Sequence, residues 1–224
     1  ADLVTRMLMQ HVYALSVTEY IGLTHSDIQK ITTTNKELKD ILFKSENINN
    51  LFQKLKSIQS DLENYLVKID SIEKRISDYI VYHNIIRFSF EKNTERIERL
   101  ISDLIRRVIY EDIPKLVQTK TNPQHSEKIL SRLAASDEVN IQSLSQSIGI
   151  SQSEINENLD ILEKAELLNM LYPFGGIDSK INKMKKYFFM SPSIRRTILS
   201  PLSNADTEIF AKMLEDTVVL YLKR

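Results

Sequence analysis

Glycine is so scarce in this chain that it limits which folds the chain can adopt. The 224 residues contain only four glycines, Gly22, Gly149, Gly175 and Gly176. Phosphate-binding loops need glycines at fixed spacings so that consecutive backbone N–H groups can converge on an anion, and none of the four lies in such a pattern. An all-β fold would also use more glycine and proline in its turns. We therefore expect a mainly α-helical chain without a nucleotide-phosphate loop of its own.

Charge and cysteine content exclude several classes of protein. Thirty Lys and Arg residues balance thirty Asp and Glu residues, which excludes a generally basic nucleic-acid coat but leaves room for a local basic patch. The absence of cysteine excludes disulfides, cysteine zinc sites and thiol catalysis, and it fits a reducing cytoplasm. No apolar run approaches the ~18 residues that a membrane span needs. We expect a soluble, cytoplasmic chain with no membrane partner.

The beginning of the chain predicts a strand followed by a short helix. Residues 6–14 form a β-favouring apolar run that is too short for a typical helix. Ser16 and Glu19 then have the spacing of a capping box, in which a hydroxyl and a carboxylate satisfy free N–H groups at a helix start. This spacing predicts a helix over about 17–23.

Apolar residues from Leu51 to Tyr79 recur at alternating steps of four and three. This repeat keeps one apolar seam on one helix face. Two interpretations remain open: a coiled coil that joins two copies into a homodimer, and an antiparallel pair of helices within one chain, which uses the same spacing. We favour the intramolecular pair because such pairs are far commoner at this length.

A further amphipathic helix is predicted over residues 95–113, and we expect Pro114 to end it. Glu111 and Asp112 lie at its C-terminal end, where the helix dipole disfavours acids, so we interpret them as a solvated helix end in preference to a partner site. Asn122 and Pro123 form a helix-breaking pair that marks the predicted domain boundary.

The second half of the chain has the element order of a winged helix-turn-helix. The predicted elements are a helix at 126–135, a short helix at 141–148, a third helix opened by a capping box at 151–154, and strands at 167–174 and 185–190. The expected fold is therefore mainly α, with a helical bundle followed by a winged helix that carries a two-stranded β-wing.

The predicted third helix and the predicted wing differ in charge. Gln152, Ser153 and Asn156 lie in the first turns of the helix, where Gln and Asn can pair with adenine edges. No Lys or Arg occurs from Ser151 to Glu163, whereas four carboxylates do, and these repel a phosphate backbone. The basic residues of the wing are Lys180, Lys183, Lys185 and Lys186. We expect the wing to contact nucleic acid or a protein partner, although such lysines also protect a hairpin edge from strand pairing.

Catalytic and metal-binding patterns are scarce. The four histidines are isolated and lack the paired spacing of metal ligands, so we assign neither a metal site nor a catalytic residue. Glu215 and Asp216 lie together in a predicted last helix, and we interpret them as its solvent-facing side.

Several segments, taken in order, resemble a large bacterial and archaeal family of predicted AAA-type ATPases. Ala1–Leu3 with Arg6, followed by Tyr13–Tyr20, resembles the ADLSRR and LSFREY segments of that family. Val108–Leu116 resembles its IYEDIP motif, and Leu214–Val218 resembles its LLED-V helix. The motifs extend over essentially the whole chain, and their order is more specific than any one of them.

The resemblance implies that this chain is the middle of a longer protein. A P-loop ATPase core would precede it and a restriction-endonuclease-like domain would follow it. The implied parts are the last core strand (1–15), a helical lid (16–121), the winged helix (122–200) and a helix leading into the nuclease-like domain (201–224). ATP and Mg²⁺ would belong to the parent protein, with no cofactor in this chain.

The resemblance also assigns two residues. Arg6 would face the nucleotide, and Glu215 would be the acidic residue on the first helix of the nuclease-like domain. The chain departs from the family pattern at Ser77–Asn84, which lacks the usual glycine-rich turn, so we expect a longer helix there.

The resulting expectation is a lid plus winged helix, without catalytic activity of its own, that couples nucleotide state to engagement of a partner or nucleic acid. The alternative is a winged-helix transcription regulator that binds DNA and dimerises through the heptad helix. A third interpretation is an interaction scaffold without a ligand.

Overall fold

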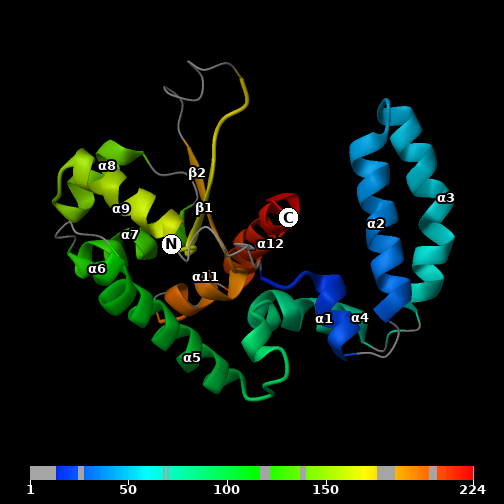
Figure 1. Ribbon diagram of the computed structural model, residues 1–224, viewed down its shortest axis with the longest axis horizontal. Coiled ribbons are helices and arrows are strands. Elements are labelled where there is room, and N and C mark those ends of the chain that lie inside the picture. Colours follow the sequence, from blue (N-terminus) through cyan, green and yellow to red (C-terminus); the bar gives the residue numbers. More distant parts are fainter. Residues whose placement is uncertain are drawn as a thin grey trace, which may run out of the picture.

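The computed structural model describes residues 14–24, 28–67, 69, 71–116, 122–136, 140–175, 185–201 and 206–223. Helices dominate the described part, and one two-stranded antiparallel sheet accompanies them (Figure 1). The expectation of a mainly α fold with a two-stranded β element is confirmed. The strand predicted at 6–14 lies outside the described residues except for its last position, and Arg6 lies outside them as well.

The helices of the first half form an arm and its base. Their bounds are α1 (Val17–Thr24), α2 (Ile28–Lys44), α3 (Ile48–Leu66), α4 (Ile72–Asp78), the π-helix η2 (Tyr79–His83) and the 3₁₀-helix η3 (Ile86–Phe88). In Figure 1, α2 and α3 lie side by side and stand apart from the rest of the molecule, which they join near α1 and α4. We call residues 28–66 the arm.

The predicted seam from Leu51 to Tyr79 is interrupted in the structure. The helix α3 packs against α2 and ends at Leu66. Ser71 then adopts a left-handed conformation with φ of 55° before α4 begins. The helix α3 thus has an intramolecular partner in α2, and dimerisation through the seam stays a prediction.

The second half continues with α5 (Thr94–Arg107), the π-helix η4 (Val108–Asp112) and α6 (Ile113–Leu116). The expected stop at Pro114 is wrong, because this proline lies inside the helical turn of α6. The Ile113 N–H bonds to the carbonyl of Val108, five residues back. A widened π turn of this kind relieves the crowding that a proline ring causes in a regular α-helix.

The winged-helix elements follow in the predicted order. They are α7 (Pro123–Ala135), α8 (Ile141–Ile148), α9 (Gln152–Lys164), β1 (Leu168–Leu171) and β2 (Lys186–Phe189). Local chemistry sets each boundary: Asn122, Asn140 and Ser151 cap the three helices with their side chains, and Gly149 ends α8 at φ of 82°. This positive φ suits glycine because it has no Cβ.

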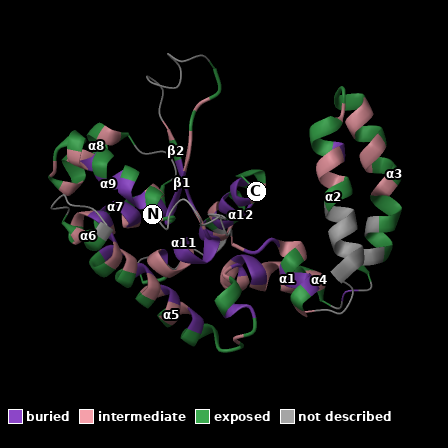
Figure 2. Ribbon diagram, viewed as in Figure 1, coloured by how far each residue is buried: buried purple, intermediate pink, exposed green. Residues whose placement is uncertain are grey.

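Two last helices, α11 (Pro192–Leu199) and α12 (Asp206–Lys223), complete the described part. The helix α11 contacts α5, α7, α12, η2 and β2. One cluster of buried side chains extends from Leu15 to Met213, and Figure 2 shows the buried residues concentrated around α11 and the base of the sheet. The winged helix and the base of the arm therefore share one core across the predicted boundary at Asn122 and Pro123.

Candidate functional site

The helix α9 presents the polar face that the sequence predicted. Gln152, Ser153 and Asn156 are all exposed, and the Asn156 amide donates a hydrogen bond to the Gln152 carbonyl at 2.9 Å. Asp160 lies further along the exposed side and pairs with Lys164 at 2.6 Å. From Gln152 to Glu163 the helix has no Lys or Arg, and the first cation, Lys164, is paired.

Two further carboxylates of α9 bond to neighbouring elements. Glu154 Oε1 lies 2.7 Å from Nδ1 of His125, on α7. Glu163 accepts a hydrogen bond from the Met170 N–H of β1 at 3.1 Å. Sequence reasoning placed both acids on a repelling surface, whereas they fasten α9 to its neighbours.

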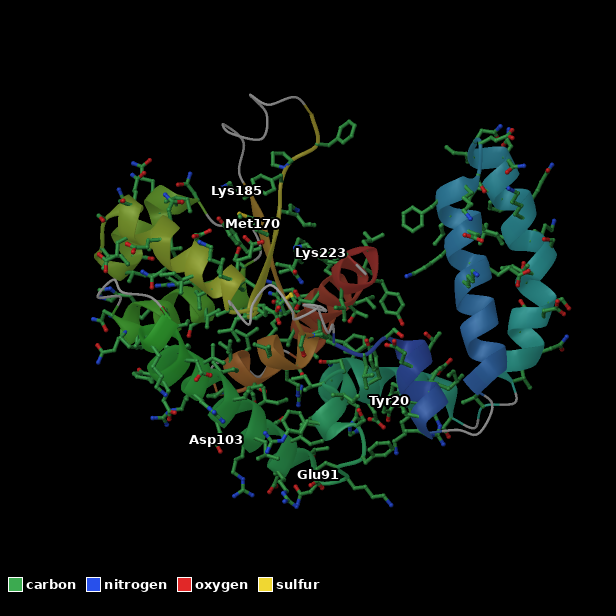
Figure 3. All side chains as sticks on the ribbon, viewed as in Figure 1. Tyr20, Glu91, Asp103, Met170, Lys185 and Lys223 are labelled. Atoms are coloured by element: carbon green, nitrogen blue, oxygen red, sulfur yellow. The ribbon has the colours of Figure 1, made fainter. Side chains whose placement is uncertain are left out.

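The wing combines exposed aromatic and basic side chains. Lys185 lies with its ammonium 5.2 Å from the centre of the Tyr172 ring, and Lys186 is exposed. Phe174 is fully exposed, at 102% of its reference area. Figure 3 shows Lys185 on the ribbon further from the body than Met170. Lys180 and Lys183 lie outside the described residues.

The base of the ribbon is buried. Burial, with a smaller contribution from Glu163, raises the pKa of Tyr187 to about 12. Its neighbour Phe189 is fully buried, and Lys223 at the end of α12 donates a hydrogen bond to Asn169 of β1 at 2.9 Å. The wing therefore projects from a firmly packed base.

A buried ion pair joins the ribbon to the last two helices. The side chains of Arg195 and Asp216 are both 0% exposed, and Nε lies 2.6 Å from Oδ2. Asp216 Oδ1 also accepts the Phe189 N–H of β2 at 2.8 Å. The Arg195 guanidinium donates to the carbonyls of Leu133 and Ala134 on α7. Every charged atom has a partner, which is what a buried ion pair needs in order to be tolerated.

The interpretation of Glu215 and Asp216 as a solvent-facing pair is therefore half wrong. Glu215 is exposed, and nothing in the described part brings it together with other acids into a site. Asp216 lies three residues after Met213 and four before Leu220, both buried. Residues three and four apart share a helix face, so the spacing of Asp216 from the apolar residues Met213 and Leu220 could have predicted that Asp216 is buried.

The segment Leu15–Val17, which we call the junction, is bonded to two distant elements. The Tyr79 hydroxyl of η2 donates to the Leu15 carbonyl, and the Leu15 N–H donates to the Asn84 carbonyl at 2.7 Å. The Val17 N–H donates to the Tyr221 hydroxyl of α12. The junction also starts α1, where Ser16 and Glu19 form the predicted capping box in both directions.

Asn84 extends this network to α11. Its amide nitrogen donates to the carbonyls of Tyr79 and Ile80 at 3.0 and 3.1 Å. Its amide oxygen accepts hydrogen bonds from the hydroxyls of Ser191 and Ser193. Because Asn84 is fully buried, these bonds replace the water that its amide would otherwise need. Sequence reasoning missed this residue, since a lone Asn after an apolar run gives no signal of burial.

A cavity of about 210 Å³ lies between α5, η4, α7 and α11. Ser102, Arg106, Glu127, Ser131 and Thr197 supply its polar lining. A hydrogen bond with the Glu127 carboxylate raises the pKa of Tyr110, on η4, above its ordinary value. Among the described residues no group of three or more potential ligands is arranged for a metal ion, and no described helix combines the length and apolarity of a membrane span.

Comparison with known proteins places this architecture in a family. Residues 88–206, from η3 through the winged helix to the start of α12, match the model of the family described as Domain of unknown function (DUF8612). The chain belongs to this family. It is also similar to the uncharacterized protein MJ1637 of Methanocaldococcus jannaschii, with 24% identity over 99% of the chain and 44% of that relative. The DUF8612 chain thus spans less than half the length of this relative, and no solved structure matches it.

Proposed function

We propose that this chain is the helical and winged-helix part of a longer ATP-dependent protein, in which it couples nucleotide state to the engagement of a partner by the wing. The ordered motifs that resemble AAA-type ATPases support this proposal. It is also supported by the similarity to a relative more than twice as long as the matched region.

The junction is the observation that carries the proposal. Residues 15–17 are held by Tyr79 and Asn84 on one side and by Tyr221 on the other. A displacement of the chain that precedes the junction would therefore act on η2 and on α12 together. Because α1 contacts α2, the arm would respond to the same displacement.

A continuous series of buried polar contacts leads from the junction to the wing. Asn84 bonds Ser193 at the start of α11, and Arg195, two residues later, pairs with Asp216. Asp216 in turn holds the Phe189 N–H of β2. Leaving a buried polar group without its partner is costly, so a shift at one end would act on the neighbouring elements. Networks of packed and hydrogen-bonded groups are one route by which coupling between distant sites can travel.

The proposal assigns the nucleotide chemistry to the parent protein. Arg6 would face the γ-phosphate region of ATP only when the ATPase core is present, and Glu215 would belong to the helix that leads into the nuclease-like domain. The alternative of a regulator that dimerises through the heptad helix is less favoured, because α3 packs against α2 within the chain.

Measurements of ATP turnover test this proposal. The isolated 224-residue chain should neither bind ATP tightly nor hydrolyse it, whereas the protein from the full reading frame should hydrolyse it. Arg6→Ala should lower that turnover by about 100-fold, the effect of losing one charge-stabilising donor, and Arg99→Ala, at an exposed position of α5, should leave it unchanged. Turnover by the isolated chain, or a full-length protein without ATP turnover, would refute the proposal.

A further inference from the structure

The outer part of the wing combines exposed aromatic and basic groups. The register pairs Leu171 with Lys186, so Tyr172 and Lys185 form the next position outward. The Lys185 ammonium lies over the Tyr172 ring at 5.2 Å, and Tyr172 is half exposed. The pair thus presents a ring face and a positive charge side by side.

Phe174 lies two residues beyond Tyr172 and is fully exposed. Exposed to this extent, Phe174 adds nothing to the core formed by the described residues, and the exposure of its ring to water is unfavourable. Aromatic side chains exposed in this way serve as platforms on which nucleic-acid bases stack.

Charge distribution favours a polyanion at this surface. The described ribbon residues, 168–175 and 185–190, include two lysines and no Asp or Glu. The neighbouring α9 instead carries four acids, Glu154, Glu157, Asp160 and Glu163, against a single cation, Lys164. A phosphate backbone would therefore be attracted to the ribbon and repelled by α9.

We infer that the wing binds single-stranded nucleic acid, with Tyr172 and Phe174 stacking on bases and Lys185 and Lys186 contacting the backbone. The inference rests on the proposed function and names the partner that the wing engages. A single strand is indicated because a ring can stack only on a base face that is free, and the bases of a duplex already stack on one another. The helix α9 contributes no contact, in contrast to an ordinary recognition helix.

Binding of a fluorescein-labelled fifteen-residue oligo(dT) to the 224-residue chain, followed by fluorescence anisotropy, tests the inference. Phe174→Ala should weaken binding about tenfold, in the range measured for the loss of one stacked base. The matched control is Phe43→Ala, because Phe43 is an exposed phenylalanine on the arm; it should bind as the wild type does.

Salt dependence tests the contribution of the lysines. For single strands the slope of log K against log salt is about −0.7 per neutralised phosphate, so Lys185→Ala/Lys186→Ala should reduce the slope by about 1.4. Lys56→Ala/Lys74→Ala, at exposed positions of α3 and α4, should leave it unchanged. Gln152→Ala/Asn156→Ala on α9 should also bind as the wild type does.

Three outcomes would overturn the inference. These are no binding of the oligonucleotide, equal affinity for Phe174→Ala and wild type, or a duplex of the same length binding as tightly as the single strand. Preferential binding of polyglutamate would point to an acidic protein partner instead. The assay contains no ATP, so its failure would leave the ATP-turnover test of the proposed function unaffected.

Discussion

Arg195 and Asp216 show how much of this architecture depends on two side chains. The guanidinium joins α7 to α11, and the carboxylate joins α12 to β2. Arg195 also lies 4.9 Å from the centre of the Phe189 ring. Burial of an ion pair contributes little net stability when compared with apolar residues, but removal of one partner leaves an uncompensated charge in the core.

We therefore expect Asp216→Asn to lower the free energy of unfolding by about 3–5 kcal/mol, measured by urea denaturation. Glu215→Gln is the matched control at the neighbouring exposed position and should change it by less than about 0.5 kcal/mol. In the double variant Arg195→Met/Asp216→Leu neither charge remains unpaired. The free energy of unfolding should therefore fall by less than the sum of the losses caused by Arg195→Met and Asp216→Leu separately. Equal effects of Asp216→Asn and Glu215→Gln would contradict the structure.

At the scale of single elements, the helix α9 depends on the N-cap residue that precedes it, Ser151. Ser151 has extended backbone, and its hydroxyl accepts the Glu154 N–H at 3.2 Å. The Glu154 carboxylate bonds His125 of α7. The first turn of α9 therefore carries both the N-cap bond and the contact with α7. In the capping box of α1, by contrast, the Glu19 carboxylate returns to the Ser16 N–H.

Ser151→Ala should therefore destabilise the protein by about 1 kcal/mol, the usual effect of losing an N-cap. Ser153 has the same side chain two residues later, but it is exposed inside the first turn of α9. Ser153→Ala should leave the midpoint of thermal unfolding unchanged or raise it slightly, because alanine favours helix interiors. A larger loss for Ser153→Ala than for Ser151→Ala would show that Ser151 does not cap the helix.

The elements that could be predicted from the sequence are those whose signals are local. Caps, the glycine after α8 and the periodicity of α9 each involve neighbouring residues, and the structure confirms the elements that they predicted. The break after Leu66 and the π turns η2 and η4 could not be predicted, because they depend on long-range packing. The same is true of Asn84, whose partners on α11 are more than 100 positions away.

At the scale of the whole molecule, the junction connects parts that are far apart in sequence. Residues 15–17 contact η2 and α12, and Asn84 joins η2 to α11. The arm and the wing project from this shared base (Figure 1). The arrangement fits the proposal that nucleotide state reaches α11 through the junction.

Hydrogen–deuterium exchange in the full-length protein, with and without ATP, is the most direct test of that claim. Tyr79→Phe/Tyr221→Phe removes two of the hydrogen bonds that hold the junction, at a cost of about 1 kcal/mol for each, and leaves the bond between the Leu15 N–H and the Asn84 carbonyl in place. The control, Tyr110→Phe, removes a hydroxyl that bonds Glu127. We predict that ATP changes the exchange of α11 amides to the same extent in the wild type and in Tyr110→Phe, and to a smaller extent in the double variant. An ATP-dependent change in α11 that is undiminished in the double variant, or no change in the wild type when ATP is bound, would contradict the account.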